Sequence, residues 1–196
     1  DNELSKYLVS EAKKNNIANF EVLGNLISDF SKLLGQEATR IPSGQHALDK
    51  EYYKRIEAVQ FTMTHDDGKI VNDLEKSDVI LVGISRTSKT PTSMYLANRG
   101  YKVSNIPIIP NKNLPTQLLE SSKKTFVVGL VCDATRLLDV RRNRIHSMHE
   151  NRPSNYVNEK EILVELENSK KLFRQHNWPV IDVTRKSVEE TAASII

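Results

Sequence analysis

The strongest constraint on the fold is the apolar run DVILV at residues 78–82. After Asp78 the run contains only branched apolar residues without polar alternation, which is typical of a strand buried on both faces. Strands that alternate with helices favour a parallel sheet covered by helices on both faces. The chain is therefore predicted to be an α/β protein with a P-loop-like parallel sheet. The pattern predicts further strands at 101–109, 125–131 and 179–183 and helices at 90–100, 134–148, 158–176 and 186–196.

The first quarter of the chain has a different pattern. Apolar spacing predicts helices at 3–14, 25–34 and 50–64, and NFEVL at 19–23 predicts a short strand. Gly, Ser and Pro gather between residues 36 and 48, which indicates a linker. We therefore expect a remnant of a small N-terminal α/β domain with its linker at residues 1–45, and a P-loop-like nucleotide-binding catalytic domain at 46–196. Because the first residue is Asp1 rather than Met, we expect the N-terminal domain to be truncated.

The composition limits the compartments and the classes of partner that are compatible with this chain. The net charge of +3 is too small to indicate a nucleic-acid partner, and no apolar run approaches the ~18 residues that span a bilayer. A single cysteine, Cys132, cannot form an internal disulfide and agrees with a reducing compartment. We expect a cytoplasmic protein with neither nucleic acid nor membrane as a partner. A homodimer is compatible with the sequence, which does not determine the number of copies.

The segment GISRTSKT follows the buried run and resembles a phosphate-binding loop. The P-loop pattern requires Gly, four residues, then Gly-Lys-Ser/Thr, and here Ser88 replaces the second glycine. A strand before the loop and a helix after it would direct backbone N–H groups at an anion. Lys89 would reach the terminal phosphates and Thr90 would bind Mg²⁺; a polar turn that caps the next helix remains the alternative. The candidate nucleotide-binding residues are Gly83, Ile84, Ser85, Arg86, Thr87, Ser88, Lys89 and Thr90.

Three further groups of charged residues are candidates for the same site. Asp66 and Asp67 could act as a general base or hold Mg²⁺, although a helix cap explains them as well. Asp133 follows a predicted strand, where it could hold Mg²⁺ or cap the next helix. Arg141 and Arg144 share a helix face and could clamp a phosphate, or form a solvated basic face. Sequence alone does not separate these alternatives.

Four stretches together resemble the regulatory proteins of pyruvate,phosphate dikinase and phosphoenolpyruvate synthase. They match that family in order and spacing and lie at residues 52–68, 78–100, 129–148 and 180–196. A serine in the loop is ordinary in this family, so the resemblance favours a phosphate loop over a simple turn. Members of the family have a further N-terminal segment, which agrees with the expected truncation.

The resemblance implies two opposed reactions. Such proteins use ADP to phosphorylate a threonine of the dikinase or synthase, which inactivates the target. They reverse this by attack of inorganic phosphate, which releases pyrophosphate. For this chain the resemblance implies Lys89 with Asp66 or Asp67 as catalytic residues, Mg²⁺ as the metal, and the target enzyme as the partner. The loop sequence Thr-Ser-Lys-Thr resembles the dikinase type more closely than the synthase type.

Two other functions are compatible with the residues themselves. A conventional P-loop kinase would use ATP on a small molecule. A regulator that binds nucleotide or RNA without catalysis would leave the acidic pair without a role. Aromatic residues are not interleaved with the arginines, which argues against RNA.

Overall fold

The computed structural model describes residues 2–20, 22–38, 49–148 and 154–196. The chain divides into two compact units, residues 1–49 and 50–196, which are considered separately below. The predicted domain boundary at residue 45/46 lies outside the described residues, as does most of the predicted linker.

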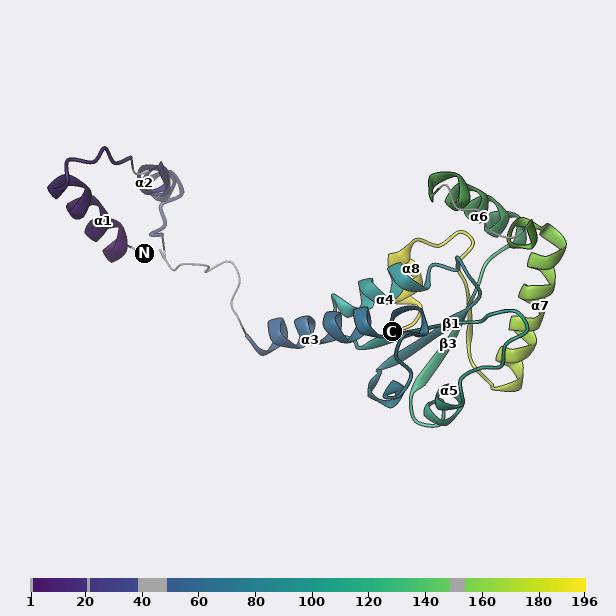
Figure 1. Cartoon of the computed structure of the whole chain (residues 1–196). Coiled ribbons are helices and arrows are strands. Elements are labelled where there is room, and N and C mark those ends of the chain that lie inside the picture. Colours follow the sequence, from purple (N-terminus) through teal and green to yellow (C-terminus); the bar gives the residue numbers. More distant parts are fainter. Residues whose placement is uncertain (1, 21, 39–48, 149–153) are drawn as a thin grey trace. The chain divides into compact units, whose positions relative to one another are not determined.

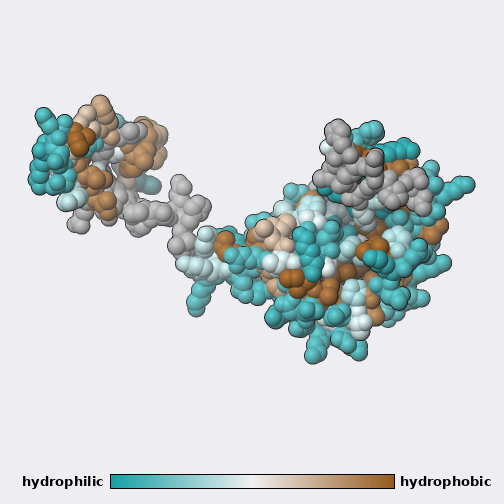
Figure 2. Space-filling view, viewed as in Figure 1, coloured by the Kyte–Doolittle hydropathy of each residue, from teal (hydrophilic) through white to brown (hydrophobic). Residues whose placement is uncertain are grey.

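The first unit contains helix α1 (Asn2–Lys14) and helix α2 (Val22–Leu34). The short strand predicted at 19–23 is wrong, because Val22 and Leu23 belong to α2. Two short helices can bury little surface, and no described side chain of this unit is fully buried. Figure 2 shows apolar residues at the surface of this unit, which include Leu4, Leu8, Phe20, Leu26 and Phe30.

The second unit is built around a sheet of four parallel strands, as the sequence predicted. These are β1 (Val79–Gly83), β2 (Val103–Pro107), β3 (Phe126–Val131) and β4 (Val180–Asp182), in the order β2-β1-β3-β4. Every residue of β1 is buried, which confirms that this strand is covered on both faces. Because all strands are parallel, their carboxyl ends lie at one edge of the sheet, and the loop after β1 begins there.

Helices flank this sheet (Figure 1). Helix α4 (Lys89–Ala97) follows the loop and packs against α3 (Lys50–Thr64) and α8 (Val188–Ala193). Helix α6 (Ala134–Met148) packs against α7 (Glu159–Gln175), which also contacts β3. The sequence did not predict the short helix α5 (Thr116–Ser121). Short 3₁₀ helices occupy Asp66–Gly68, Leu74–Lys76 and Ser154–Val157.

Close packing holds α7 against the centre of the sheet. A Cβ atom on Gly129 of β3 would lie 2.6 Å from the Phe173 ring of α7, so only glycine allows this approach. Phe173 is fully buried, and Trp178 beyond the end of α7 joins the same core. The core therefore fixes the sheet edge from which the loop after β1 projects. Among the described residues, no helix is long and apolar enough to cross a membrane.

Candidate active site

The loop that follows β1 turns sharply against the neighbouring strand. A Cβ atom on Gly83 would lie 2.7 Å from the Leu130 carbonyl oxygen of β3 and 2.7 Å from Thr87 Oγ1. Glycine is therefore required at the first position of the loop. The buried Thr87 hydroxyl donates to the Ile84 carbonyl oxygen at 3.0 Å, which closes the turn from inside.

Two non-glycine residues of the loop have left-handed backbones. Arg86 has φ 71°, and Ser88, where the P-loop pattern has its second glycine, has φ 58° and ψ 22°. Such conformations cost of order 1–3 kcal/mol each and gather at functional sites. The backbone at position 88 is left-handed, which explains why the P-loop pattern has glycine at this position. Left-handed residues within a turn make successive N–H groups converge into a concave anion site.

Lys89 begins helix α4 and is 6% exposed. Its Nζ donates to the Ile84 carbonyl oxygen at 2.9 Å, so the ammonium lies against the loop. Burial lowers the pKa of Lys89 from 10.5 to about 8, although Asp67 and Asp66 act in the opposite direction. A buried cation beside converging N–H groups suits the terminal phosphates of a nucleotide.

Thr90, the next residue of α4, connects the loop to the acidic pair. Its hydroxyl donates to Asp66 Oδ1 at 3.0 Å. The amide nitrogen of Asn105, on β2, lies 2.6 Å from the same carboxylate oxygen and 3.1 Å from Thr90 Oγ1. Three segments of the chain thus meet in one polar cluster, which we call the Asp66 cluster (Asp66, Thr90 and Asn105).

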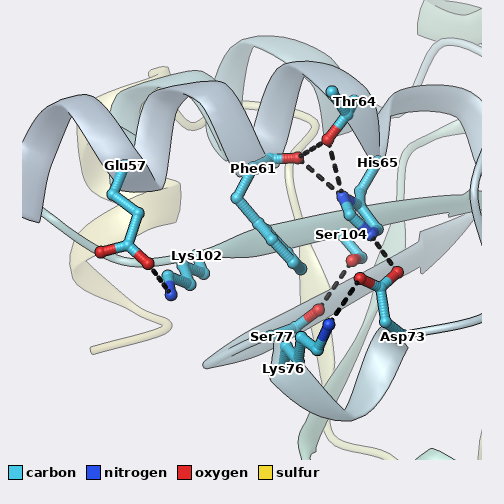
Figure 3. Close-up of polar contacts among 9 residues, drawn as sticks. All are labelled: Glu57, Phe61, Thr64, His65, Asp73, Lys76, Ser77, Lys102 and Ser104. Atoms are coloured by element: carbon cyan, nitrogen blue, oxygen red, sulfur yellow. Dashed lines mark hydrogen bonds and ion pairs between the residues drawn. The ribbon is translucent and has the colours of Figure 1, made fainter.

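The turn that carries Asp66 is anchored by the residue before it (Figure 3). The buried His65 ring stacks on Phe61 with ring centroids 3.8 Å apart. Its Nδ1 lies 2.8 Å from the Phe61 carbonyl oxygen and its Nε2 lies 2.7 Å from Asp73 Oδ1. The hydrogen bond from His65 lowers the pKa of the Asp73 carboxyl below its usual range. This anchor fixes where the acidic pair begins.

Asp67 lies next in the turn but is placed differently from Asp66. Its backbone is left-handed, with φ 59°, and its side chain is exposed. It makes no hydrogen bond with any other described residue, whereas Asp66 is held by Thr90 and Asn105. The structure therefore separates the two carboxylates that the sequence left equivalent.

Arg141 is buried at 1% exposure, which differs from a solvated basic face. Its Nη2 lies 2.7 Å from Glu165 Oε2 and 3.4 Å from the Ser85 carbonyl oxygen in the loop. Its Nη1 donates to the Tyr156 carbonyl oxygen at 3.2 Å, and its guanidinium stacks on the Tyr156 ring. Arg141 therefore contacts the backbone of the loop at Ser85 and helps to hold the loop in place.

Arg144 lies one turn further along α6 and is half-buried. Its buried Nε has no hydrogen-bond partner among the described residues, and the same holds for Arg86 Nε in the loop. Asp133 precedes α6, where its Oδ1 accepts from the N–H groups of Thr135 and Arg136. These are the contacts of a helix N-cap, and the metal role of Asp133 stays a prediction.

Comparison with known proteins decides the family. A family model described as kinase/pyrophosphorylase matches residues 1–196. The chain belongs to the kinase/pyrophosphorylase family. Together with the relatives described next, this confirms the resemblance to the regulatory proteins, and membership of the family supports a phosphotransferase activity.

Relatives agree with this family. A protein of Pelagibacter ubique strain HTCC1062 is 55% identical over 196 residues, which covers 100% of this chain and 72% of the relative. A protein of Sphingopyxis alaskensis is 45% identical over 194 residues, covering 99% of this chain and 72% of the relative. A protein of Chelativorans sp. strain BNC1 is 45% identical over 196 residues, covering 100% of this chain and 72% of the relative. All three are named "Putative pyruvate, phosphate dikinase regulatory protein".

The donor set of the Asp66 cluster fits a magnesium ion. Mg²⁺ prefers oxygen ligands and is usually held by one or two carboxylates together with substrate phosphates and water. Asp66 Oδ1 and Thr90 Oγ1 supply a carboxylate and a hydroxyl oxygen 3.0 Å apart at the start of α4. No group of three or more His, Cys, Asp or Glu suited to a metal occurs in the described part of the chain, and this kind of site does not need one.

Sequence reasoning missed Asn105 and Glu165 as members or supports of the site. For Asn105 a signal was present, because an amide stands directly before the apolar residues IPII within the predicted strand YKVSNIPII. For Glu165 no signal existed, since it lies 24 residues from its partner Arg141 on a different helix.

The buried Lys89 generates a stability prediction. Its pKa is about 8 in the folded protein and 10.5 when unfolded, so the unfolded state binds more protons between these values and stability rises with pH through that window. Below pH 8 the cost of burying the ammonium is fully present. Lys89→Met should therefore raise the free energy of unfolding at pH 7 by about 3 kcal/mol, since the pKa falls from 10.5 to about 8 and each pKa unit corresponds to about 1.4 kcal/mol.

Urea unfolding of both proteins at pH 7 and pH 10 measures this effect. The advantage of Lys89→Met should shrink at the higher pH, because only the wild-type protein gains stability through the titration of this group. Equal stabilities at pH 7, or a less stable Lys89→Met, would show that the ammonium is not buried at a cost.

Proposed function

We propose that this chain is the catalytic part of an ADP-dependent protein serine/threonine kinase that phosphorylates and inactivates pyruvate,phosphate dikinase, and that it also removes this phosphate by phosphorolysis. Membership of the kinase/pyrophosphorylase family supports the transfer of a phosphoryl group as the reaction class, and the names of the relatives support the dikinase as the target. The observation that carries the proposal is the meeting of Lys89, Thr90 and Asp66 at the phosphate loop. Phosphoenolpyruvate synthase is the alternative target.

In the kinase direction, the N–H groups of the loop and the Lys89 ammonium hold the phosphates of ADP. The threonine hydroxyl of the target attacks the β-phosphorus, the new P–O bond forms, and the bond to the α-phosphate oxygen breaks to release AMP. Asp67 is the base in this proposal, because its exposed carboxylate is free to accept the proton of the attacking hydroxyl. Fixed positive charge at the loop stabilises the developing negative charge.

Asp66 has a different role in the proposal. Its carboxylate and the Thr90 hydroxyl would hold Mg²⁺, which supplies charge neutralisation for the phosphoryl oxygens when bound. The hydrogen bonds from Thr90 and Asn105 keep the Asp66 carboxylate in place beside the loop. The hydrogen bonds occupy the Asp66 carboxylate, which is why the proton is assigned to Asp67.

In the phosphorylase direction, inorganic phosphate attacks the phosphothreonine, so that pyrophosphate forms and the threonine hydroxyl is restored. Free phosphate needs a binding group of its own. The sequence suggested Arg141 and Arg144, and the two are now separated by their surroundings. The buried Nε of each arginine has no hydrogen-bond partner among the described residues, but both Nη atoms of Arg141 are engaged by Glu165 and by backbone carbonyl oxygens, whereas the Arg144 guanidinium makes no hydrogen bond with a described residue. We assign phosphate binding to Arg144 and support of the loop to Arg141.

The direct test is incubation of the chain with purified dikinase, phosphoenolpyruvate and ADP, followed by mass spectrometry of the dikinase. A phosphothreonine that appears with ADP, and disappears when phosphate is added with release of pyrophosphate, supports the proposal. ATP in place of ADP, and synthase in place of dikinase, are the matched controls. A chain that phosphorylates a small molecule with ATP, and leaves both enzymes unmodified, would refute it.

The two carboxylates generate a paired prediction. Asp67→Asn keeps the shape but removes the base, so the rate of transfer should fall by roughly 10²–10⁴-fold while ADP affinity stays within about twofold. Asp66→Asn should instead weaken ADP binding in the presence of Mg²⁺. Single-turnover rates and calorimetric titrations of both variants measure this split. The assignment is wrong if Asp67→Asn transfers phosphate at the normal rate.

Arg144 generates a prediction that distinguishes the two directions. Arg144→Ala should raise the apparent KM for inorganic phosphate roughly ten- to a hundredfold, because a charge-assisted hydrogen bond typically contributes ~1.5–3 kcal/mol. The KM for ADP should change much less. Arg142→Ala removes an exposed arginine from the same helix and should leave both values unchanged. Equal changes in both directions for Arg144→Ala would exclude a dedicated phosphate site.

A further inference from the structure

Asn105 occupies an unusual position for an amide. It lies on strand β2, where Leu81 of β1 is its register partner, and it is 0% exposed. Its strand neighbours Val103 and Ile106 belong to the hydrophobic core. A polar side chain buried at such a position is costly unless its hydrogen bonds are satisfied.

The contacts of Asn105 determine the orientation of its amide. One end of the amide lies 2.6 Å from Asp66 Oδ1 and 3.1 Å from Thr90 Oγ1. An amide oxygen placed 2.6 Å from a carboxylate oxygen would be repelled, so this end is the NH₂ group. Both of its hydrogens are used, one toward each partner.

The other end of the amide has no partner. Asn105 Oδ1 is buried and accepts no hydrogen bond from any described residue. A buried acceptor left unpaired is unfavourable, and such groups in folded proteins call for a specific explanation. The amide therefore serves Asp66 and Thr90 at the expense of its own oxygen, which a residue chosen for the fold alone would not do.

The backbone of Asn105 acts on the same turn. Its N–H donates to the His65 carbonyl oxygen at 3.0 Å, directly before Asp66. The main chain and the side chain of Asn105 thus hold two consecutive residues, His65 and Asp66, against strand β2. The side-chain amide of Asn105 also contacts Thr90, which lies on helix α4.

We propose that Asn105 is a positioning residue that sets the Asp66 carboxylate against the Thr90 hydroxyl, so that both oxygens face the magnesium ion of a bound nucleotide. The inference rests on the proposed function and goes further by assigning a residue outside the loop and the acidic turn. Asn105 touches neither nucleotide nor target in this proposal. It acts through the orientation of Asp66 and Thr90.

Asn105→Leu tests this, because leucine has nearly the shape of asparagine without its polar atoms. ADP affinity is measured by calorimetry with and without Mg²⁺, and the melting temperature is measured in parallel. The increase in ADP affinity that Mg²⁺ causes should shrink roughly ten- to a hundredfold, which corresponds to the loss of one charge-assisted hydrogen bond. Affinity without Mg²⁺ should stay within about twofold. The melting temperature should be unchanged or higher, since the unpaired oxygen is also removed.

Ser104→Ala is the matched control on the same strand. The Ser104 hydroxyl is buried and lies 2.7 Å from the Ser77 hydroxyl (Figure 3). Successive side chains of a strand point to opposite faces, so Ser104 does not share the face of its neighbour Asn105. This variant should lower the melting temperature and leave the magnesium effect on ADP affinity unchanged. Should Asn105→Leu fail to fold, Asn105→Ala is measured in the same way and should show the same loss of the magnesium effect.

The outcomes separate the inference from the proposed function. A wild-type protein that binds no ADP overturns the proposed function and this inference with it. A wild-type protein whose ADP affinity rises with Mg²⁺, together with Asn105 variants that keep the full rise, overturns the inference alone. A lower melting temperature with an intact magnesium effect would make Asn105 a residue of the fold only.

Discussion

The close approach between the loop and strand β3 is the constraint on which the rest of the site depends. At position 83 the Leu130 carbonyl oxygen and the Thr87 hydroxyl leave no space for a Cβ atom, so this residue must be glycine. The chain must therefore turn immediately where β1 ends. Within this turn Arg86 and Ser88 have left-handed backbones, and helix α4 begins directly after it. The positions of Lys89 and Thr90 follow from that geometry.

The site also shows where function opposes stability. A buried ammonium with its pKa lowered to about 8 is held at Lys89. Asp67, Arg86 and Ser88 have left-handed backbones, and the amide oxygen of Asn105 has no partner among the described residues. Each of these features costs free energy in the folded protein. They all lie within the loop, α4, the turn that carries Asp66 or the contacts of Asp66. The hydrophobic core of the sheet and the packing of α7 on β3 offset these costs.

Particular elements show how far sequence reasoning reached. The uninterrupted apolar run of β1 predicted a strand buried on both faces, and every residue of β1 is buried. The Ser-x-x-Glu spacing of Ser187 and Glu190 predicts a capping box, which is present at the start of α8. The strand at 19–23 was wrong, because apolar residues in a short segment do not distinguish a strand from the first turn of a helix. The sequence could not show which of Asp66 and Asp67 has which role, because they are neighbouring residues of the same type and fit the same sequence pattern. Their roles depend on which of them faces Thr90 and Asn105.

In the second unit the sequence by itself determined the four strands and every α-helix except α5 in their order along the chain, the parallel sheet, and the loop with its lysine and threonine. These follow from local patterns: apolar periodicity, glycine positions and a motif of fixed spacing. Only the tertiary structure decided which polar and charged side chains lie together. Asn105 lies 39 residues from Asp66 and 15 from Thr90, and Arg141 lies 24 residues from Glu165. Such pairs form because parallel strands end at one edge of the sheet and packed helices bring distant residues together, and no local pattern in the sequence encodes that distance.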